Sequence, residues 1–414
     1  MTLTVALRHR NFRNLFVGRT AAETANVVAP VALAFAVLDL TGSPATLGLV
    51  VAARSAANVV LLLFGGVLAD RLPRAVILQG TEVGAAASQA ILAAAVLGDF
   101  ASIPLLVALS VINGALAAIS LPAAAAATPQ TVPAPLLAPA NALIRLGSNT
   151  GRITGAAAGG ALVAGVGPGW AMAAVVVLFL LAALGYRGVR VPVARTGPAA
   201  SPLADLRAGW REFTSRRWVW VVVAQFAVVN ALIAGCVVVL GPVVADETFG
   251  RAAWGLVLAA QTAGAFVGGV LAARFQPRRA LLIGVAVTAV EAVPLAILAG
   301  FPHVLPLTVA MFVSGLALEQ FVVAWDVSLQ ENIPEGALAR VYSYDMLGSF
   351  VALPAGEILA GPLAESVGAP ATLLGGAALL LVVTGLALLS RDVRSLRRKP
   401  VSPTSPQGDR SATG

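Results

Sequence analysis

A few charged and amide side chains lie inside long apolar stretches of this sequence, where they could move a proton or bind a charged ligand. Arg19 and Glu23 are four residues apart, so they share one face of a helix. Arg145, Asn149 and Arg152 follow the same helical spacing further along the chain. A charge at the centre of a bilayer costs about 2.5–3.5 kcal/mol on insertion scales. Each buried charge is therefore a candidate for a paired or functional group.

Glu23 and Glu319 are the best candidates for proton coupling, because a carboxyl group gains a proton when buried and loses it when wetted. A structural Arg19–Glu23 pair, with Arg19 reaching toward the membrane interface, is an equally good interpretation of the first site. A lone amide in such a helix is more often a hydrogen-bonding group between helices than a ligand. The candidates for a substrate or proton cavity are Glu23, Asn26, Arg54, Asn58, Asn113, Arg145, Asn149, Arg152, Glu291, Glu319 and Gln320.

Sequence signatures of catalysis and nucleotide binding are missing. The chain has no Gly-x4-Gly-Lys-Ser/Thr phosphate loop, no Gly-x-Ser-x-Gly and no His-Glu-x-x-His. Cys236 is the only cysteine, and the only two histidines, His9 and His303, are far apart in the sequence. We therefore expect neither an enzyme nor an ATP-driven pump with its own nucleotide domain, and no cofactor and no metal. Any energy for transport would come from an ion gradient.

The composition places these side chains in a membrane. Hydrophobic residues make up 58% of the 414 residues and charged residues only 11%, with a mean hydropathy of +0.89. Soluble domains carry about 25% charged residues. Twelve stretches approach the length of about 20 residues that crosses a bilayer as a helix. We predict spans at 14–38, 45–69, 75–98, 101–123, 138–164, 169–188, 218–244, 252–273, 279–300, 304–326, 339–363 and 369–390.

The second half of the chain repeats features of the first. Gly65 to Arg71 reads GGVLADR, and Gly268 to Arg274 reads GGVLAAR. Thr131-Val132-Pro133 is matched by Asn332-Ile333-Pro334. Repeats of this kind are typical of membrane transporters. We therefore expect an N-terminal six-helix bundle over 1–190, a cytoplasmic linker over 191–217, a C-terminal six-helix bundle over 218–395 and a disordered tail over 396–414.

The arginines predict the orientation. They gather on alternate connections, while the opposite connections carry acidic residues and few others. Positive loops stay in the cytoplasm, so both termini are expected there, in a multi-pass protein of the cytoplasmic membrane. The net charge of +8 does not indicate nucleic-acid binding, because the arginines separate apolar spans instead of forming one polar face.

The connection after the second span carries the motif Gly65-Gly66-x-x-Ala69-Asp70-Arg71-x-x-Arg74. It resembles the signature of the major facilitator superfamily, although Pro73 and Ala75 depart from that pattern. The resemblance implies an all-α membrane protein with twelve transmembrane helices in two pseudo-symmetric six-helix bundles. The segments Leu7–Arg13 and Val132–Asn141 are similar to the exporter branch that includes macrolide efflux pumps and the enterobactin exporter.

The same resemblance implies a gating role for Gly65, Gly66, Asp70, Arg71 and Arg74. In the family the aspartate meets the start of span eleven in one conformation and releases it in the other. In this sequence that start is near Arg340, and Ala273 replaces the aspartate in the second copy of the motif. The alternative is a loop whose arginines only fix the topology.

Span five contains Gly151, Gly155 and Gly159 on one helix face, followed by Gly160. This segment resembles the exporter signature Gly-x-x-x-Gly-Pro-x-x-Gly-Gly, with Ala156 in place of the proline. The glycines predict a close helix contact, either a surface on which a neighbour rocks or ordinary small-residue packing.

Together these observations predict a monomeric secondary active transporter that exports a small drug-like or endogenous molecule across the cytoplasmic membrane by alternating access. We expect proton antiport, with the substrate, protons and the lipid bilayer as its partners and no nucleic acid. The alternatives are proton-coupled uptake of a metabolite, or a non-transporting membrane receptor or scaffold of the same fold.

Overall fold

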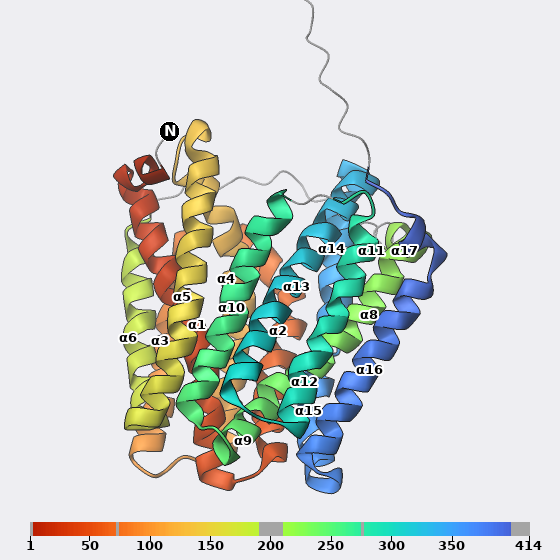
Figure 1. Cartoon of the computed structure of the whole chain (residues 1–414). Helices are drawn as coiled ribbons and strands as arrows, with labels where there is room; N and C mark the ends of the chain where they lie inside the picture. Colours follow the sequence, from red (N-terminus) through yellow and green to blue (C-terminus); the bar gives the residue numbers. More distant parts are fainter. Residues whose placement is uncertain (1–2, 72–73, 190–209, 275–276, 399–414) are drawn as a thin grey trace, which may run out of the picture.

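The computed structural model describes residues 3–71, 74–189, 210–274 and 277–398 (Figure 1). The side chains of residues 62–74 lie outside the described part. Within these ranges the chain is helical, with short turns and no strand.

Six long helices form the first half, and each is continuous. The short helix η1 (Leu3–Arg8) precedes them, and η2 (Thr128–Gln130) and η3 (Ala134–Leu136) lie between the fourth and the fifth. Glycine and proline separate neighbouring helices, as at Gly42 (φ 63°) and at Gly167 (φ 87°) before Pro168. The six are α1 (Arg10–Thr41), α2 (Pro44–Arg71), α3 (Arg74–Leu97), α4 (Ile103–Ala127), α5 (Leu137–Val166) and α6 (Pro168–Arg187).

In the second half, three of the predicted spans are interrupted. Its elements are α8 (Arg217–Ile233), η4 (Ala234–Val239), α9 (Leu240–Glu247), α10 (Arg251–Arg274), α11 (Ala280–Val287), η5 (Thr288–Glu291), α12 (Ala292–Gly300), α13 (Val304–Asn332), α14 (Glu335–Phe350), α15 (Leu353–Val367), α16 (Ala369–Leu389) and α17 (Arg391–Ser395). The π-helical segment η4 interrupts the span predicted over 218–244. The 3-10 turn η5 interrupts 279–300, and residues 351–352 separate α14 from α15 within 339–363.

Proline accounts for the position of each interruption. A proline has no N–H to donate to the carbonyl four residues earlier, and its ring collides with that carbonyl. Pro242, Pro294 and Pro354 lie four residues after Val238, Val290 and Phe350, which lie in or beside the three irregular segments. Proline alone is not sufficient, because Pro30 and Pro362 lie inside continuous helices.

Eleven segments of the described chain are long and apolar enough to cross a membrane. The 30-residue α5 is a further long helix, but its polar residues, such as Arg145 and Arg152, lower its hydropathy. With α5 the structure has the twelve spans that the sequence predicts. Several ends differ from the prediction, since helices extend past the apolar stretch; α13, for example, runs to Asn332 and not to 326.

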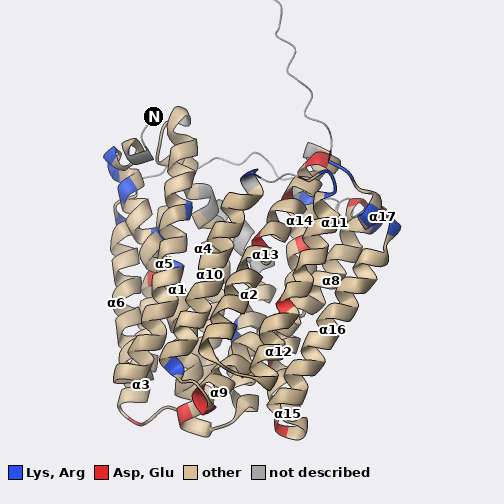
Figure 2. Ribbon diagram, viewed as in Figure 1, with Lys and Arg blue, Asp and Glu red and all other residues tan. Residues whose placement is uncertain are grey.

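The two halves repeat the same packing and meet along two helix pairs. In the first half α2 packs on α4 and α3 on α6, and in the second α10 packs on α13 and α12 on α16. The halves meet where α5 contacts α10 and where α15 contacts α2. One end of the molecule, the terminal face, holds the N-terminus and α17, whereas the opposite end, the α9 face, holds α9 (Figure 1). Arginines gather at the terminal face (Figure 2).

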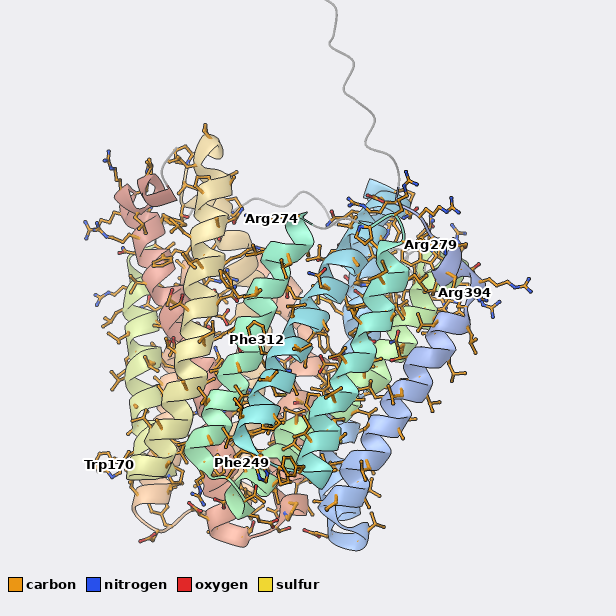
Figure 3. The ribbon with its side chains drawn as sticks, viewed as in Figure 1. Trp170, Phe249, Arg274, Arg279, Phe312 and Arg394 are labelled. Carbon is orange, nitrogen blue, oxygen red and sulfur yellow. The ribbon has the colours of Figure 1, made fainter. Side chains whose placement is uncertain are left out.

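Large apolar side chains cover the outside of the bundle. Leu305 is 74% exposed and Leu389 is 67% exposed. Trp170 points outward from α6 near the α9 face (Figure 3). This pattern is that of a surface in contact with lipid, with an aromatic residue near one membrane interface.

Candidate functional site

A polar cavity of about 340 Å³ lies inside the first half, where all six of its helices contribute to the wall. Five charged side chains line this polar cavity: Arg19, Glu23, Arg54, Glu82 and Arg152. Asn26 and Asn113 line it as well. Charged groups in an apolar bundle are expensive to bury, so their convergence on one cavity marks it as the leading candidate for a binding site.

Glu23 on α1 forms an ion pair with Arg152 on α5. Arg152 Nε lies 2.8 Å from Glu23 Oε2, and the two side chains are 50% and 21% exposed. Arg19 bonds elsewhere, because its Nη1 donates to the Ala124 carbonyl on α4 at 3.0 Å. The Arg19–Glu23 pair considered from the sequence is therefore replaced by a pair between two helices far apart in the chain.

Glu82 on α3 also lines the polar cavity, although the sequence analysis did not predict it. It is only 5% exposed, and its Oε2 is buried without a hydrogen-bond partner in the structure. Glu82 stands directly before the charge-free stretch from Val83 to Gly98. The sequence did contain a signal for this residue, because Glu82 is the eighth residue of the span predicted over 75–98.

A second cavity of about 350 Å³, the interhalf cavity, lies between the two halves. From the first half it is lined by Arg54, Ser55, Asn58, Val59 and Leu121. From the second half it is lined by four apolar residues, Met346, Leu347, Phe350 and Leu353, around the break between α14 and α15. It shares Arg54 and Leu121 with the polar cavity, so the two cavities adjoin.

Arg54 on α2 lies between these cavities. It forms no ion pair or hydrogen bond with any residue in the described ranges, and the attractive charge acting on it is that of Glu357. Glu357 on α15 is 3% exposed, and one of its oxygens accepts a hydrogen bond from Ser55 Oγ at 2.9 Å. Its other oxygen is buried without a partner. The sequence reading left Glu357 out of the cavity set.

Ion pairs close the α9 face. Arg251 at the start of α10 donates from Nε to Asp246 at 2.7 Å and from Nη1 to Asp39 on α1 at 3.0 Å. Ser43 Oγ donates to Glu365 at 2.7 Å, which joins the start of α2 to the end of α15. These contacts tie the two halves together at one end of the molecule.

Glycines allow the helices of the two halves to touch. A Cβ on Gly160 of α5 would lie 2.7 Å from the Cα of Gly255 on α10. A Cβ on Gly48 of α2 would collide with the backbone carbonyl of Glu357. Only a residue without a side chain permits these approaches.

The glycine face of α5 has a different neighbour. Cβ atoms on Gly151 and Gly155 would contact Thr24 on α1, and one on Gly159 would contact Val28. These three glycines therefore pack two helices of the same half, whereas Gly160 faces the other half.

Three amides of the predicted set bond within the first half. Asn26 Nδ2 donates to the Ala22 carbonyl of its own helix at 2.9 Å. Asn58 Nδ2 donates to the Gly114 carbonyl at 3.3 Å, and Asn113 Nδ2 to Ser88 Oγ at 2.9 Å. Asn113 thus joins α4 to α3 beside the polar cavity, the kind of interhelical bond expected for a lone amide.

The remaining predicted residues do not line either cavity. Arg145 is exposed on α5 and Asn149 is half-buried there. Glu319 on α13 is attracted by both Arg145 and Arg152 across the two halves. Glu291 is 3% exposed in η5, and its Oε1 is buried without a hydrogen-bond partner among the described residues.

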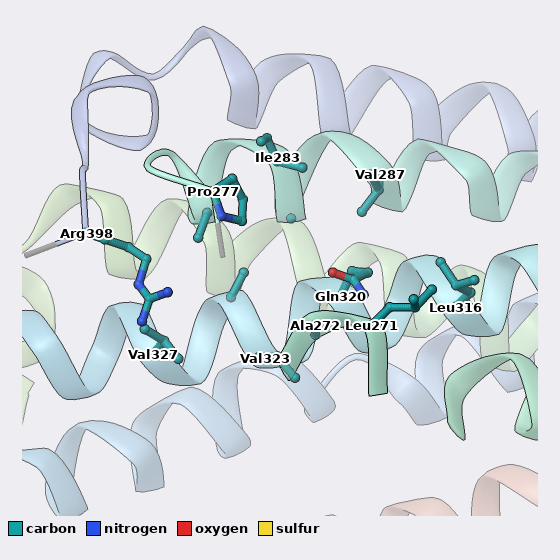
Figure 4. A pocket seen from close by; sticks show the side chains of 13 residues that line it. Leu271, Ala272, Pro277, Ile283, Val287, Leu316, Gln320, Val323, Val327 and Arg398 are labelled. Carbon is teal, nitrogen blue, oxygen red and sulfur yellow. The ribbon is translucent and has the colours of Figure 1, made fainter. Parts of the chain in front are cut away.

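Gln320 faces a different hollow, which we call the outer groove (Figure 4). Its Nε2 donates to the Gly268 carbonyl at 2.8 Å. The outer groove holds about 480 Å³ between α10, α11 and α13, and apart from Gln320 and Arg398 its lining is apolar, as at Leu271 and Val323. Its lack of converging polar groups makes it a weaker candidate for substrate binding than the polar cavity.

The predicted gating motif falls largely outside the described part of the structure. Helix α2 ends at Arg71 and α3 begins at Arg74, but the side chains of Gly65 to Arg74, including Asp70, are not described. Arg340, near the expected contact of Asp70, lies in α14. The gating role of this motif stays a prediction.

Among the described residues, eleven segments are long and apolar enough to cross a membrane, and with α5 they form two related halves that contact each other at one face and contain a polar cavity. This arrangement is typical of a membrane transporter. Comparison with known families agrees: the family described as transmembrane secretion effector matches residues 2–407, and the chain belongs to this family of the major facilitator superfamily. Comparison with curated proteins gives no matching sequence.

Solved structures show the same fold. A bacterial homologue of the human lysosomal transporter Spinster, in its inward-facing and unoccupied conformation, has 17% identity and a TM-score of 0.72. That match covers 93% of this chain and 97% of the homologue. The nucleoside transporter NupG has 14% identity and a TM-score of 0.72, with 94% of this chain and 98% of NupG covered.

Proposed function

We propose that this transporter exports a small organic molecule across the cytoplasmic membrane in exchange for protons. The observation that carries the proposal is the polar cavity, in which Glu23 on α1 pairs with Arg152 on α5, a helix that contacts α10 of the other half. Both termini would be cytoplasmic, because the arginines gather at the terminal face. The description of the family as a secretion effector supports the outward direction.

The coupling step would be a change of partner at Arg152. This arginine is paired with Glu23 at 2.8 Å in its own half and is attracted by Glu319 in the other half. A proton on Glu23 removes that negative charge and weakens the pair. Arg152 then interacts more strongly with Glu319, which changes the balance of forces between the halves. Substrate binding and proton binding thereby act on the same equilibrium.

Proton flux in proteoliposomes tests the proposal. The purified chain is reconstituted with the pH-sensitive dye pyranine inside, and organic compounds of different charge are added on one side. We expect some compounds to drive proton movement in the direction opposite to their own. Glu23→Gln, which cannot change its charge, abolishes this proton movement, whereas the exposed Glu247→Gln on the α9 face leaves it unchanged.

The outcomes separate the alternatives. Proton movement in the same direction as the compound would show symport and uptake. No compound-driven proton movement and no compound flux would support a receptor or scaffold. If Glu23→Gln transports the compound at an unchanged rate and still couples this transport to protons, Glu23 has no role in the mechanism.

A further inference from the structure

Arg54 is a charge inside the membrane that lacks a direct protein counter-ion. It lies in the eleventh position of α2, far from either end of that 28-residue helix. It lines both the polar and the interhalf cavity, yet no carboxylate in the described ranges comes within ion-pair distance of it. A charge in this position needs a partner, because its burial without one is costly.

None of the nearby carboxyl groups in the described ranges forms an ion pair with Arg54. Glu23 is held by Arg152. Glu357 attracts Arg54 from a distance, but it lines neither cavity, and one of its oxygens accepts a hydrogen bond from Ser55. Glu82 lines the polar cavity but not the interhalf cavity.

The charges that line the two cavities also favour binding of an anion. Arg19, Arg54 and Arg152 face the polar cavity together with two glutamates, Glu23 and Glu82, so one positive charge exceeds the negative charges. In the interhalf cavity, Arg54 is the only charged residue among the described lining residues. Opposite it stands the apolar wall of Met346, Leu347, Phe350 and Leu353.

We infer that the substrate is a small amphipathic organic anion whose acidic group pairs with Arg54 and whose apolar body contacts this wall. The inference rests on the proposed function, since it names the substrate class of that transporter and places the substrate in the interhalf cavity, which adjoins the polar cavity. Such a molecule contacts α2 with one end and α14 and α15 with the other. It therefore bridges the two halves, as a ligand that biases the equilibrium between their arrangements must do. The volume of about 350 Å³ suits a molecule with one or two rings.

Matched acids and amides test the inference. The purified full chain in detergent is titrated with 2-naphthoate and with 2-naphthamide, which have nearly the same shape but differ in charge. A panel of other aromatic acid–amide pairs is measured in the same way. Binding is read from the rise in melting temperature with concentration. We expect acids of the panel to bind about tenfold or more tightly than their amides, as a charge-assisted hydrogen bond requires.

Variants at Arg54 show whether this residue makes the distinction. Arg54→Gln is expected to bind acid and amide equally, and Arg54→Lys to keep part of the preference, because it keeps the charge but not the two-pronged geometry. Arg187→Gln at the end of α6, outside both cavities, keeps the full preference. The melting temperature without ligand shows whether each variant is folded.

Three results would overturn the inference: amides that bind as tightly as acids, a preference for acids that persists in Arg54→Gln, or no binding by any acid of the panel. Failure of the proposed function looks different. Suppose that an acid binds through Arg54 but is not transported and drives no proton movement in proteoliposomes. This result would support the anion-binding site and contradict the proposed antiport.

Discussion

The two halves of the molecule place polar side chains at corresponding positions but pair them with different helices. In the first half Asn113 on α4 donates to Ser88 on α3. In the second, Ser314 on α13 accepts from Gln261 on α10 at 3.5 Å. Asn113 and Ser314 are separated in the chain by the same number of residues as Thr131 and Asn332 of the repeat. The same position of the repeat therefore joins α4 to α3 in the first half and α13 to α10 in the second.

The two halves also differ in the position of their buried carboxyl groups and in the continuity of their helices. The carboxyl groups of Glu23 and Glu82 line the polar cavity, whereas Glu291 is sealed in the second half. The first half has continuous helices, and the second has three interrupted ones. We interpret the first half as the part whose charged side chains line the polar cavity and the second as the part that bends, because irregular segments within helices mark hinges.

The largest effect is expected where the two halves touch. In Gly160→Leu, a side chain enters a space where even a Cβ lies 2.7 Å from Gly255 and 2.8 Å from the Arg251 carbonyl. Backbone atoms cannot yield as a flexible side chain does, so the α9 face should be unable to close and transport should fall by two orders of magnitude or more. A cysteine placed at Val239, which is 0% exposed and lies beside Gly48 of the other half, should become reactive to an impermeant thiol reagent.

Gly165→Leu is the matched control, because it lies on the same helix and its Cβ would meet no atom within 4 Å. It should transport normally, and the cysteine at position 239 should stay as unreactive as it is in the chain with Gly160. Equal transport by both leucine variants would mean that the α5–α10 contact does not have to close.

A moderate effect is expected at the break in the second half. Pro354→Ala restores an N–H that can bond to the Phe350 carbonyl and removes the collision of the ring, so α14 and α15 can join as one helix. The melting temperature should rise, and transport should slow severalfold because the hinge stiffens. Pro362→Ala, in the uninterrupted part of α15, should change the rate much less. Equal slowing in both variants would contradict the hinge.

Much of the fold could be predicted from the sequence because it follows from solvent and length. Apolar stretches of sufficient length predict spans, and the fold class is confirmed by the structure and the family match. The interruptions were missed, because hydropathy does not register which backbone hydrogen bonds a proline removes. Their signal was present at Pro242, Pro294 and Pro354.

The site was harder to predict. Local spacing places Arg145, Asn149 and Arg152 on one face, but the partner of Arg152 is Glu23, far away in the chain. Helix spacing cannot identify a partner on another helix. From the sequence, a structural Arg19–Glu23 pair and a functional Glu23 were therefore equally good interpretations. The same limit explains why Glu357 was not among the predicted cavity residues. Its partners, Ser55 and Arg54, lie on α2, far away in the chain.

The smallest effect is expected at the ion pairs of the α9 face, and it separates the two kinds of contact that hold the halves together. Arg251→Gln removes the bonds to Asp39 and Asp246, but these three side chains are 21%, 42% and 34% exposed. Partly exposed pairs contribute about 0.2–1 kcal/mol each and are screened by salt. The closed arrangement should therefore lose only severalfold in population, measured as a modest rise in the reactivity of a cysteine at Ser43. Raising the ionic strength should produce part of the same rise in the unsubstituted arginine protein and none in Arg251→Gln, because the variant no longer has the charge that salt screens. A loss as large as that of Gly160→Leu would show instead that charge, and not the backbone contact of α5 with α10, holds this face closed.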